Sequence, residues 1–182
     1  EPLHPGFLAG RAEQHLAGQI YSGLTRFNHE ASQPQGDLAH HWSVSDNGLC
    51  WQFYIRSTLH WHNGDAVETE QLRRRLLMLL ELPELAKLFS SVKAITQTPP
   101  QCLTFTLHHP DYWLPHRLAS YCSVLAHPDK PSQGTGPFML KIFEPELVRI
   151  ESHHQYHHSH PLLQAIEYWI TPQLFEQGLG TS

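Results

Sequence analysis

The chain has 182 residues, a formal net charge of −5, and 40% hydrophobic and 16% charged residues. These proportions are typical of a soluble globular protein with a core of ordinary size, which excludes disorder over the whole chain. The basic residues Arg73, Arg74 and Arg75 form one short run rather than a stripe, which argues against nucleic-acid binding because phosphate contacts need clustered Lys and Arg.

The sequence also bears on membrane and redox context. No apolar stretch reaches the roughly 18 residues of a membrane span, so direct membrane insertion is not expected. Cys50, Cys102 and Cys122 each lie in an apolar run, and we expect reduced, buried thiols, which favours a reducing compartment. The chain begins with Glu1 rather than Met, so we expect a piece of a longer protein, and export stays open.

The first segment whose sequence predicts a regular structure is amphipathic and lies near the N-terminus. Residues 11–26 place Leu16, Ile20 and Leu24 at intervals of four. This spacing predicts a helix with one apolar face, which ends near Gly23.

A strand and a second helix are predicted next. Residues 50–56 alternate apolar and polar side chains behind a turn-forming Ser-Asp-Asn-Gly sequence, which predicts a strand entered from a tight turn. An Asn-Gly turn at 63–64 then leads into a helix whose apolar stripe runs from Leu72 to Leu79 and which Pro83 ends.

The second half of the chain is predicted to be rich in strands. Residues 92–107 form a hairpin about two prolines, and a short helix covers 111–120. Two strands flank a Glu-Pro turn at 144–145, and a last strand at 165–172 alternates Ile166, Tyr168 and Ile170. Interleaved strands and helices predict a mixed α/β (α+β) protein.

Five histidines lie within eight consecutive positions near the end of the chain. On a helix, residues four apart can share a metal, which would pair His153 with His157 and His154 with His158. The segment lies between a predicted strand and Pro161, where a helix is not expected. We therefore predict an exposed loop that catches metal ions adventitiously, with no native metal and no other cofactor.

The remaining candidates for chemistry are weak. His60 and His62 would point the same way in a strand, but the Asn-Gly turn that follows favours a turn position. We find no nucleophile motif and no framed carboxylate pair, so no catalytic residue is expected. Gly-Thr-Gly-Pro at 134–137 lacks the lysine of a phosphate loop and is predicted to be a rigid turn opening a strand, because glycine allows unusual φ and Pro137 fixes φ.

Five motifs follow one another along the chain: Ile-Tyr-Ser-Gly-Leu-Thr-Arg, a Leu-Ala-x-x-Trp stretch, a His-x-Gly turn, a Gly-Thr-Gly-Pro-aromatic strand start, and a tyrosine loop before a proline. In this order they resemble the family 5 extracellular solute-binding proteins, the oligopeptide, dipeptide and nickel binders of ABC importers. The matching positions are Leu38, Ala39, Trp42, Ser45, Asp46, Gly48, His62, Gly64, Gly134 to Phe138, Tyr156 and Pro161.

Within this family, the likeness is closest to the C-terminal ligand-sensing domain of SgrR-type transcriptional regulators of sugar-phosphate stress. The segments SGLTRFN, LAHHW and DYWLP, together with Glu68, carry that preference. Two departures stand out. His157 replaces the tryptophan that follows Tyr156 in the family pattern, and Glu68 and Gln71 replace a Thr and an Asp at a helix start, which weakens the expected N-cap.

The resemblance implies the type II periplasmic-binding-protein fold, in which two lobes close on a ligand like a hinge. Residues 1–182 would be the N-terminal portion of such a domain, mostly one lobe, without the second lobe and without a DNA-binding domain. Because both lobes contact the ligand, this piece alone is expected to bind weakly or not at all.

The implied function is non-catalytic recognition of a small solute, a sugar phosphate or a peptide, in a cytoplasmic regulator that contacts DNA through an absent N-terminal domain. One alternative is the periplasmic component of an ABC importer for oligopeptides or metal chelates, which docks on a permease. Another is a metal-dependent enzyme built on His60, His62 and the histidine loop.

By position in the family, four residues are expected to face the ligand. They are Gln14 and Ser22 on the first helix, and Tyr121 and Ser123 on a strand. For Tyr121 the alternative is a core position, because it stands beside the apolar Cys122.

Overall fold

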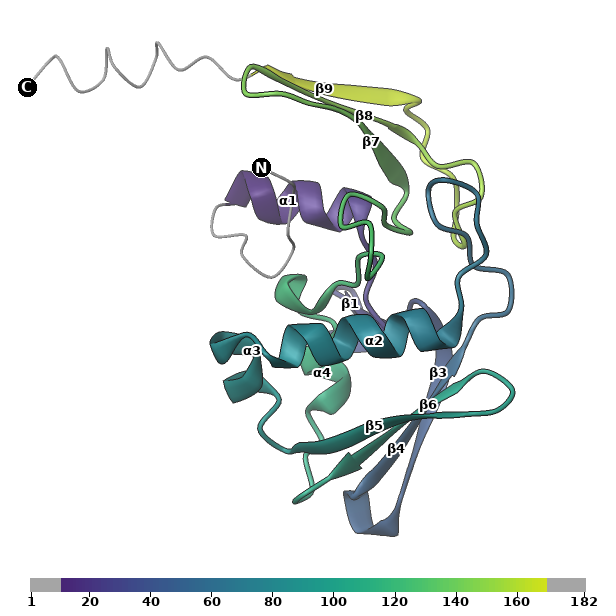
Figure 1. Cartoon of the computed structure of the whole chain (residues 1–182), viewed down its shortest axis with the longest axis vertical. Coiled ribbons are helices and arrows are strands. Elements are labelled where there is room, and N and C mark those ends of the chain that lie inside the picture. The colour runs from purple at the N-terminus through teal and green to yellow at the C-terminus, as the bar shows by residue number, and fades with distance from the viewer. Residues whose placement is uncertain (1–10, 170–182) are drawn as a thin grey trace, which may run out of the picture.

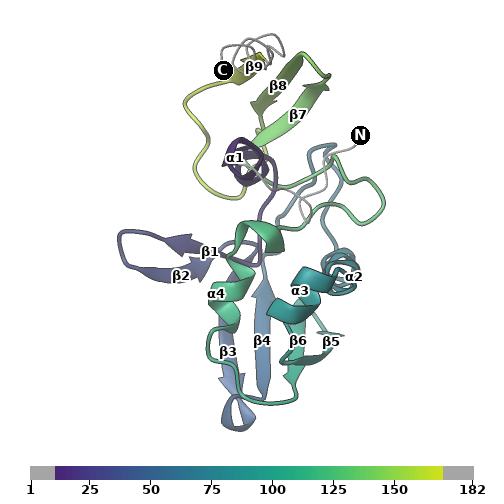
Figure 2. The same cartoon turned by 90° about the vertical axis from the view of Figure 1, so that its left-hand side faces the viewer.

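The computed structural model describes residues 11–169, which form three antiparallel sheets and four α-helices (Figures 1 and 2). In chain order the elements are α1 (Arg11–Ile20), β1 (Thr25–Asn28), β2 (Gln33–Gly36), β3 (Ala39–Ser45), β4 (Cys50–Ile55), α2 (Thr69–Leu80), α3 (Pro83–Leu88), β5 (Val92–Thr98), β6 (Cys102–Leu107), α4 (Leu114–Leu118), β7 (Phe138–Phe143), β8 (Leu147–Ser152) and β9 (Ala165–Trp169). Short 3₁₀ turns lie at Asp46–Gly48 and Tyr121–Ser123.

The larger of two hydrophobic cores, called here the large core, is built on a four-stranded sheet of order β3-β4-β6-β5. Helix α2 runs across this sheet (Figure 1). The predicted alternation in β4 is confirmed, because Trp51, Phe53 and Ile55 are all buried. The predicted hairpin is also confirmed, since β5 and β6 pair antiparallel and Phe105 of β6 packs edge to face on Phe53.

The second core, called here the small core, lies between α1 and a sheet of order β7-β8-β9 (Figure 1). Leu16 and Ile20 of the helix meet Phe138 and Ile150 of the sheet. The three predicted strands are therefore confirmed, although Ile170, assigned to the last strand, lies outside the described residues.

The first helix is shorter than predicted. It ends at Ile20, and the chain then enters a two-stranded hairpin, β1-β2, that the apolar spacing did not predict. Leu24 was expected to lie on the same apolar helix face as Leu16 and Ile20. It is buried in the large core instead, whereas Leu16 and Ile20 are buried in the small core. A four-residue spacing cannot by itself distinguish a longer helix from a chain that passes from one core to the next.

Close packing, rather than an unusual backbone angle, explains why glycine stands at positions 134 and 136. Neither Gly134 nor Gly136 has a positive φ. A Cβ atom on Gly134 would lie 2.2 Å from the carbonyl oxygen of Ile20, and the N–H of Gly136 donates to that oxygen at 2.8 Å. The predicted strand start is confirmed, because β7 begins at Phe138 directly after Pro137.

The start of α2 is capped in spite of the missing threonine. The backbone N–H of Glu68 donates to Oε1 of Gln71 at 2.9 Å, so the weakened N-cap is offset by the residue three positions later. Pro83 ends α2 as predicted, and it also opens α3.

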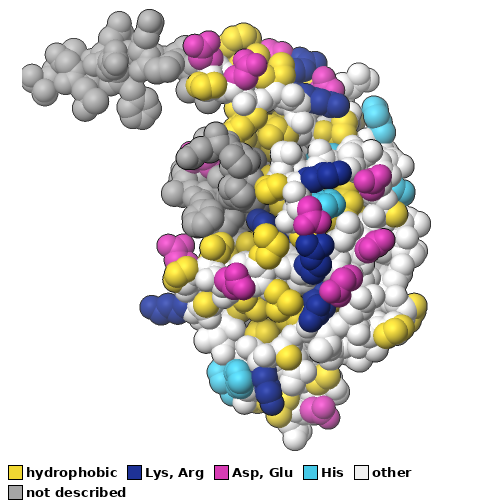
Figure 3. Space-filling model, viewed as in Figure 1, with side chains coloured by type: hydrophobic (Ala, Val, Ile, Leu, Met, Phe, Trp, Pro, Cys, Tyr) yellow, Lys and Arg dark blue, Asp and Glu magenta, His cyan; other side chains and the backbone are white. Residues whose placement is uncertain are grey.

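Acidic and basic side chains lie close to one another on the face of the molecule that Figure 3 shows. Arg73 pairs with Glu70 at 2.8 Å and Arg74 with Asp129 at 2.9 Å. Arg73 and Arg74 are therefore paired with carboxylates, and Arg75 is buried, so the arginine run does not present a basic patch. Among the described residues, 11–169, no helix is long and apolar enough to cross a membrane.

The three cysteines are free thiols. Cys102 is buried, as expected, whereas Cys50 and Cys122 are only half-buried.

Candidate functional site

The histidine loop between β8 and β9 is not the exposed loop that was predicted. His153 is 2% exposed, and the side chains of His157 and His158 are 3% and 16% exposed. His154 and His160 do face solvent. The imidazoles of His153 and His157 are thus buried and that of His158 is half-buried, because each contacts a residue from a distant part of the chain.

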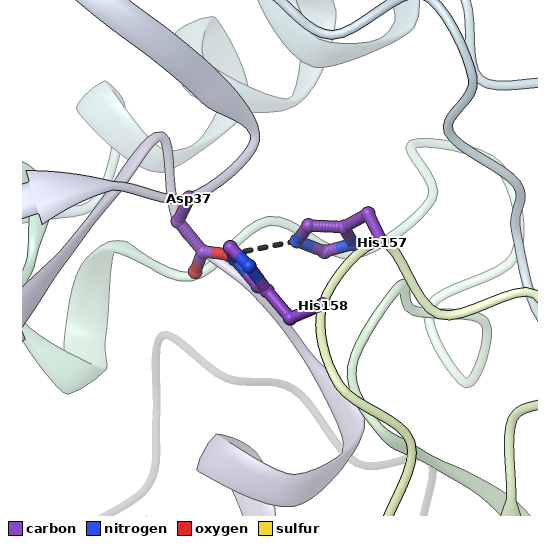
Figure 4. A group of neighbouring side chains, drawn as sticks. All are labelled: Asp37, His157 and His158. Carbon is purple, nitrogen blue, oxygen red and sulfur yellow. Dashed lines mark hydrogen bonds and ion pairs between the residues drawn. The ribbon is translucent and has the colours of Figure 1, made fainter.

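Asp37 is the partner of two of these histidines. It is buried between β2 and β3, and its Oδ1 atom lies 2.8 Å from Nε2 of His157 and 3.0 Å from Nε2 of His158 (Figure 4). The backbone bends at positions 157 and 158, so neighbouring side chains that would diverge in a strand both reach one carboxylate. The pairs four residues apart, which the sequence favoured on a helix, do not form here.

The protonation of this cluster follows from burial and hydrogen bonding. Burial acts to raise the pKa of Asp37, but the hydrogen bonds from His157 and His158 outweigh it and hold the pKa below its usual value. Burial lowers the pKa of His157, and the hydrogen bond to Asp37 only partly opposes this. The carboxylate is therefore ionised and the His157 imidazole neutral near pH 7.

His62 and His153 form a second histidine contact, which joins the His-x-Gly turn and the histidine loop to the Gly-Thr-Gly-Pro segment. Nδ1 of His62 accepts the N–H of Gly134 at 3.3 Å, and its Nε2 donates to the carbonyl of Gly136 at 3.2 Å. Nδ1 of His153 donates to the same carbonyl at 3.2 Å, and the two rings meet edge to face with centroids 4.8 Å apart. His62 is thus a turn residue that holds the Gly-Thr-Gly segment in place, as its turn position predicted.

Acid is expected to destabilise the fold through His62. Burial, with a contribution from His153, lowers the pKa of His62 to about 3, whereas an exposed histidine in the unfolded chain titrates near ~6.5. The folded state therefore binds fewer protons, so stability is complete above about pH 6.5 and falls as the pH drops towards 3, by on the order of 1 kcal/mol per pH unit.

Urea denaturation at pH 7.5 and pH 5 measures this effect. Exchange of His62→Asn keeps an acceptor for Gly134 and should flatten the pH dependence, whereas His154→Gln, at an exposed histidine, should keep it. Equal acid sensitivity in wild type and His62→Asn would contradict this assignment.

Two hollows flank the Asp37 cluster. One, of about 450 Å³, is lined by polar groups that include Gln19, Arg26, Tyr156 and His158. The other, of about 350 Å³, is lined by residues that include His157, Arg56 and Gln101. The cluster is therefore buried but has open space beside each imidazole.

The four residues predicted to face a ligand are only partly brought together. The N–H of Leu125 donates to the carbonyl of Ser22 at 2.8 Å, so the end of the first helix does lie beside the segment of Tyr121 and Ser123. That segment is a 3₁₀ turn, not the predicted strand, and Ser22 lies beyond the helix rather than on it.

Their side chains differ in access. Ser22 and Ser123 are buried, and Oγ of Ser123 donates to the carbonyl of Arg117 at 2.8 Å. Gln14 is half-buried, and Tyr121 is 45% exposed, which rules out the alternative of a core position for it. None of the four lines either of the two hollows, and their contact with a ligand stays a prediction.

Sequence reasoning missed Asp37. Asp37 belongs to no motif of its own and lies 120 residues from His157, so no local spacing in the sequence indicates that the two residues are in contact. The only available signal was the Gly-Asp dipeptide just before the Leu-Ala-x-x-Trp motif, and a Gly-Asp dipeptide is ordinary turn chemistry.

Comparison with protein families gives one match over most of the chain. Residues 33–174 match the bacterial extracellular solute-binding proteins, family 5, middle region. The uncharacterized protein YbaE of Escherichia coli (strain K12) is 70% identical over 182 residues, which are 100% of this chain and 32% of YbaE. The HTH-type transcriptional regulator SgrR of Yersinia pestis (strain Pestoides F) is 32% identical over 185 residues, covering 97% of this chain and 32% of SgrR.

The chain thus spans about a third of the length of these curated relatives. Among solved structures, NikA from Brucella suis in complex with Fe(III)-EDTA superposes with a TM-score of 0.85 and 19% identity, over 97% of this chain and 40% of NikA. AgaA from A. tumefacien R10 in complex with agropinic acid gives a TM-score of 0.83 and 20% identity, over 98% of this chain and 40% of AgaA. At these identities the likeness concerns the fold alone.

Proposed function

The chain belongs to the bacterial extracellular solute-binding proteins of family 5, and we propose that it is part of a non-catalytic domain that recognises a small solute. It has the type II periplasmic-binding-protein fold, as its motifs predicted. The observation that carries the proposal is the family match over residues 33–174, because that family is defined by solute binding rather than by a reaction.

The finer proposal is a ligand-sensing domain of an SgrR-like transcriptional regulator that acts in the cytoplasm. Its support is the 32% identity to SgrR across almost the whole chain. Since the chain covers a third of SgrR, contact with DNA would be made by another part of such a protein. The solute would favour a closed form of the domain over an open one, and this population shift would be transmitted to the DNA-binding part.

Two alternatives receive less support. A periplasmic component of an ABC importer shares the fold of NikA and AgaA, but at 19–20% identity the fold does not separate importer from regulator. A metal-dependent enzyme on His60 and His62 is disfavoured, because both ring nitrogens of His62 are already bonded to the backbone of Gly134 and Gly136.

We propose residues 1–182 as the N-terminal portion of the solute-binding domain, mostly one lobe of it. Solute affinity in a hinged domain comes from both lobes, so the chain alone should bind weakly or not at all. Any test of binding therefore needs the full-length gene product.

Solute binding is tested by isothermal calorimetry and thermal shift on the full-length gene product, with a panel of sugar phosphates and short peptides. We expect saturable binding of one class, with a rise in melting temperature that grows with solute concentration by mass action. DNA footprinting with and without that solute, together with cell fractionation, separates regulator from importer. A periplasmic protein without a DNA footprint would overturn the regulator, and saturable turnover of a bound compound would overturn the non-catalytic role.

A further inference from the structure

Three donor atoms from opposite ends of the chain converge on one point. One carboxylate oxygen of Asp37 and one ring nitrogen each of His157 and His158 lie within 4.8 Å of one another, and Oδ1 of Asp37 contacts both Nε2 atoms (Figure 4). Asp37 lies just before β3 of the four-stranded sheet, and the histidines lie in the loop between β8 and β9 of the three-stranded sheet. A single hydrogen bond would be enough to anchor the loop, but here two imidazoles contact the same carboxylate.

We propose that Asp37, His157 and His158 bind a divalent first-row transition-metal ion through these three atoms. Two imidazoles and a carboxylate suit Zn²⁺, Ni²⁺, Co²⁺ or Fe²⁺, and three protein ligands leave coordination positions open. Ligand atoms about 2.1 Å from a tetrahedral metal lie about 3.4 Å apart. The N–O separations of 2.8 and 3.0 Å therefore need to open by only about 0.5 Å to admit the ion.

The protonation state suits this role. Metal ligands must present a free lone pair, and the pKa of Asp37 and that of His157 are both held low, which keeps the carboxylate charged and the imidazole neutral. In the hydrogen-bonded form the neutral imidazole of His157 carries its single proton on Nε2 and donates it to Asp37. On metal binding this proton moves to Nδ1, which frees the lone pair of Nε2 for the ion without releasing a proton.

The surroundings provide access, and they also provide opposing positive charge from Arg56 and from Arg26, which lines the same hollow as His158. His158 lines the hollow of about 450 Å³ and His157 the one of about 350 Å³, so water or a small chelator can reach the open coordination positions. Nε of Arg56 donates to the main-chain carbonyl of Asp37 at 2.6 Å. Its positive charge limits affinity, and we expect a Kd in the micromolar range rather than that of a structural zinc site.

A bound ion would tie the large core to the small core. The Asp37 contact joins the start of the four-stranded sheet to the loop of the three-stranded sheet. Near the ends of the loop, the N–H of Ser152 donates to the carbonyl of Gln164 and that of His153 to the carbonyl of Pro137. Because the ion would bind the folded state, the melting temperature should rise as the metal concentration is increased above the Kd.

The tag-free full-length gene product is titrated with Zn²⁺ by calorimetry, and the bound metal is counted by mass spectrometry after dialysis. We expect about one equivalent of Zn²⁺, and a loss of affinity of at least about tenfold in His158→Gln and in Asp37→Asn. The matched control is His154→Gln/His160→Gln, which removes the two exposed histidines of the same loop and should bind as wild type does. Zinc K-edge absorption on wild type should show two imidazole ligands.

Four results would overturn the proposal. Zn²⁺ binding that survives His158→Gln, or that disappears in the exposed-histidine control, would assign the ion to the surface. No binding at about 100 μM Zn²⁺ would leave Asp37 and the histidines as a hydrogen-bonded latch only. If His158→Gln fails to fold, the absorption spectrum of wild type decides, because a ligand set without two imidazoles excludes this site.

Discussion

Exchange of Gly134→Ala is expected to destabilise the folded chain by about 3 kcal/mol. The added Cβ would lie 2.2 Å from the carbonyl oxygen of Ile20 and 2.7 Å from Cδ1 of Tyr21. The carbonyl is part of the backbone at the end of α1 and accepts the N–H of Gly136, so it cannot move away without breaking that bond. Separating the two segments would also loosen the small core, because Ile20 is completely buried there.

Urea denaturation of Gly134→Ala beside Gly18→Ala measures this effect. Gly18 lies within α1, and a Cβ atom there meets nothing within 4 Å. Alanine at this site should stabilise the protein by up to about 1 kcal/mol, since it forms helix better than glycine. A Gly134→Ala variant within about 0.5 kcal/mol of wild type would show that the close approach of the two segments is not rigid.

Exchange of Trp61→Ala should destabilise the chain by about 3 to 5 kcal/mol, the largest effect of a single truncation that we expect. The Trp61 side chain is 0% exposed within the large core, and its ring packs on His127. Its Nε1–H also donates to Oε1 of Gln71 at 2.9 Å, the atom that caps α2 through the N–H of Glu68. Truncation therefore leaves a cavity and frees a residue that fixes the start of a helix.

Trp113→Ala is the matched control for Trp61, because the same side chain is removed from a position that is 61% exposed. Its loss should change the unfolding free energy by less than about 1 kcal/mol, since little apolar surface returns to water. Thermal and urea unfolding of both variants compare the two sites. Similar losses for Trp61→Ala and Trp113→Ala would contradict the description of the large core.

Most of the regular structure could be predicted because short-range periodicity reports on one buried face. In β4 the alternation of Trp51, Phe53 and Ile55 has the period of a strand, and one register buries all three. The stripe in α2 works in the same way, with Leu72, Leu76 and Leu79 buried at helical spacing. These elements each meet a single core, so the local pattern and the tertiary environment agree.

Prediction from the sequence failed where a single short segment, residues 16–24, contributes side chains to both hydrophobic cores. The chain leaves α1 after Ile20 so that Leu24 can enter the large core, and β1 then starts at Thr25. The same spacing of four would fit a continuous helix, and only the position of the second core decides between them. The Tyr121–Ser123 segment is likewise a 3₁₀ turn because it crosses between the cores, beside Ser22, rather than joining a sheet.

The sequence by itself determined the class of fold, most strands and helices, and membership of the family, since periodicity and ordered motifs are properties of neighbouring residues. Only the tertiary structure decided which histidines are buried and what they contact. His157 is buried and His158 half-buried because Asp37, 120 and 121 residues away, supplies a charge that offsets the loss of water around their rings. A contact of this kind depends on how two sheets meet, which no local spacing along the chain records.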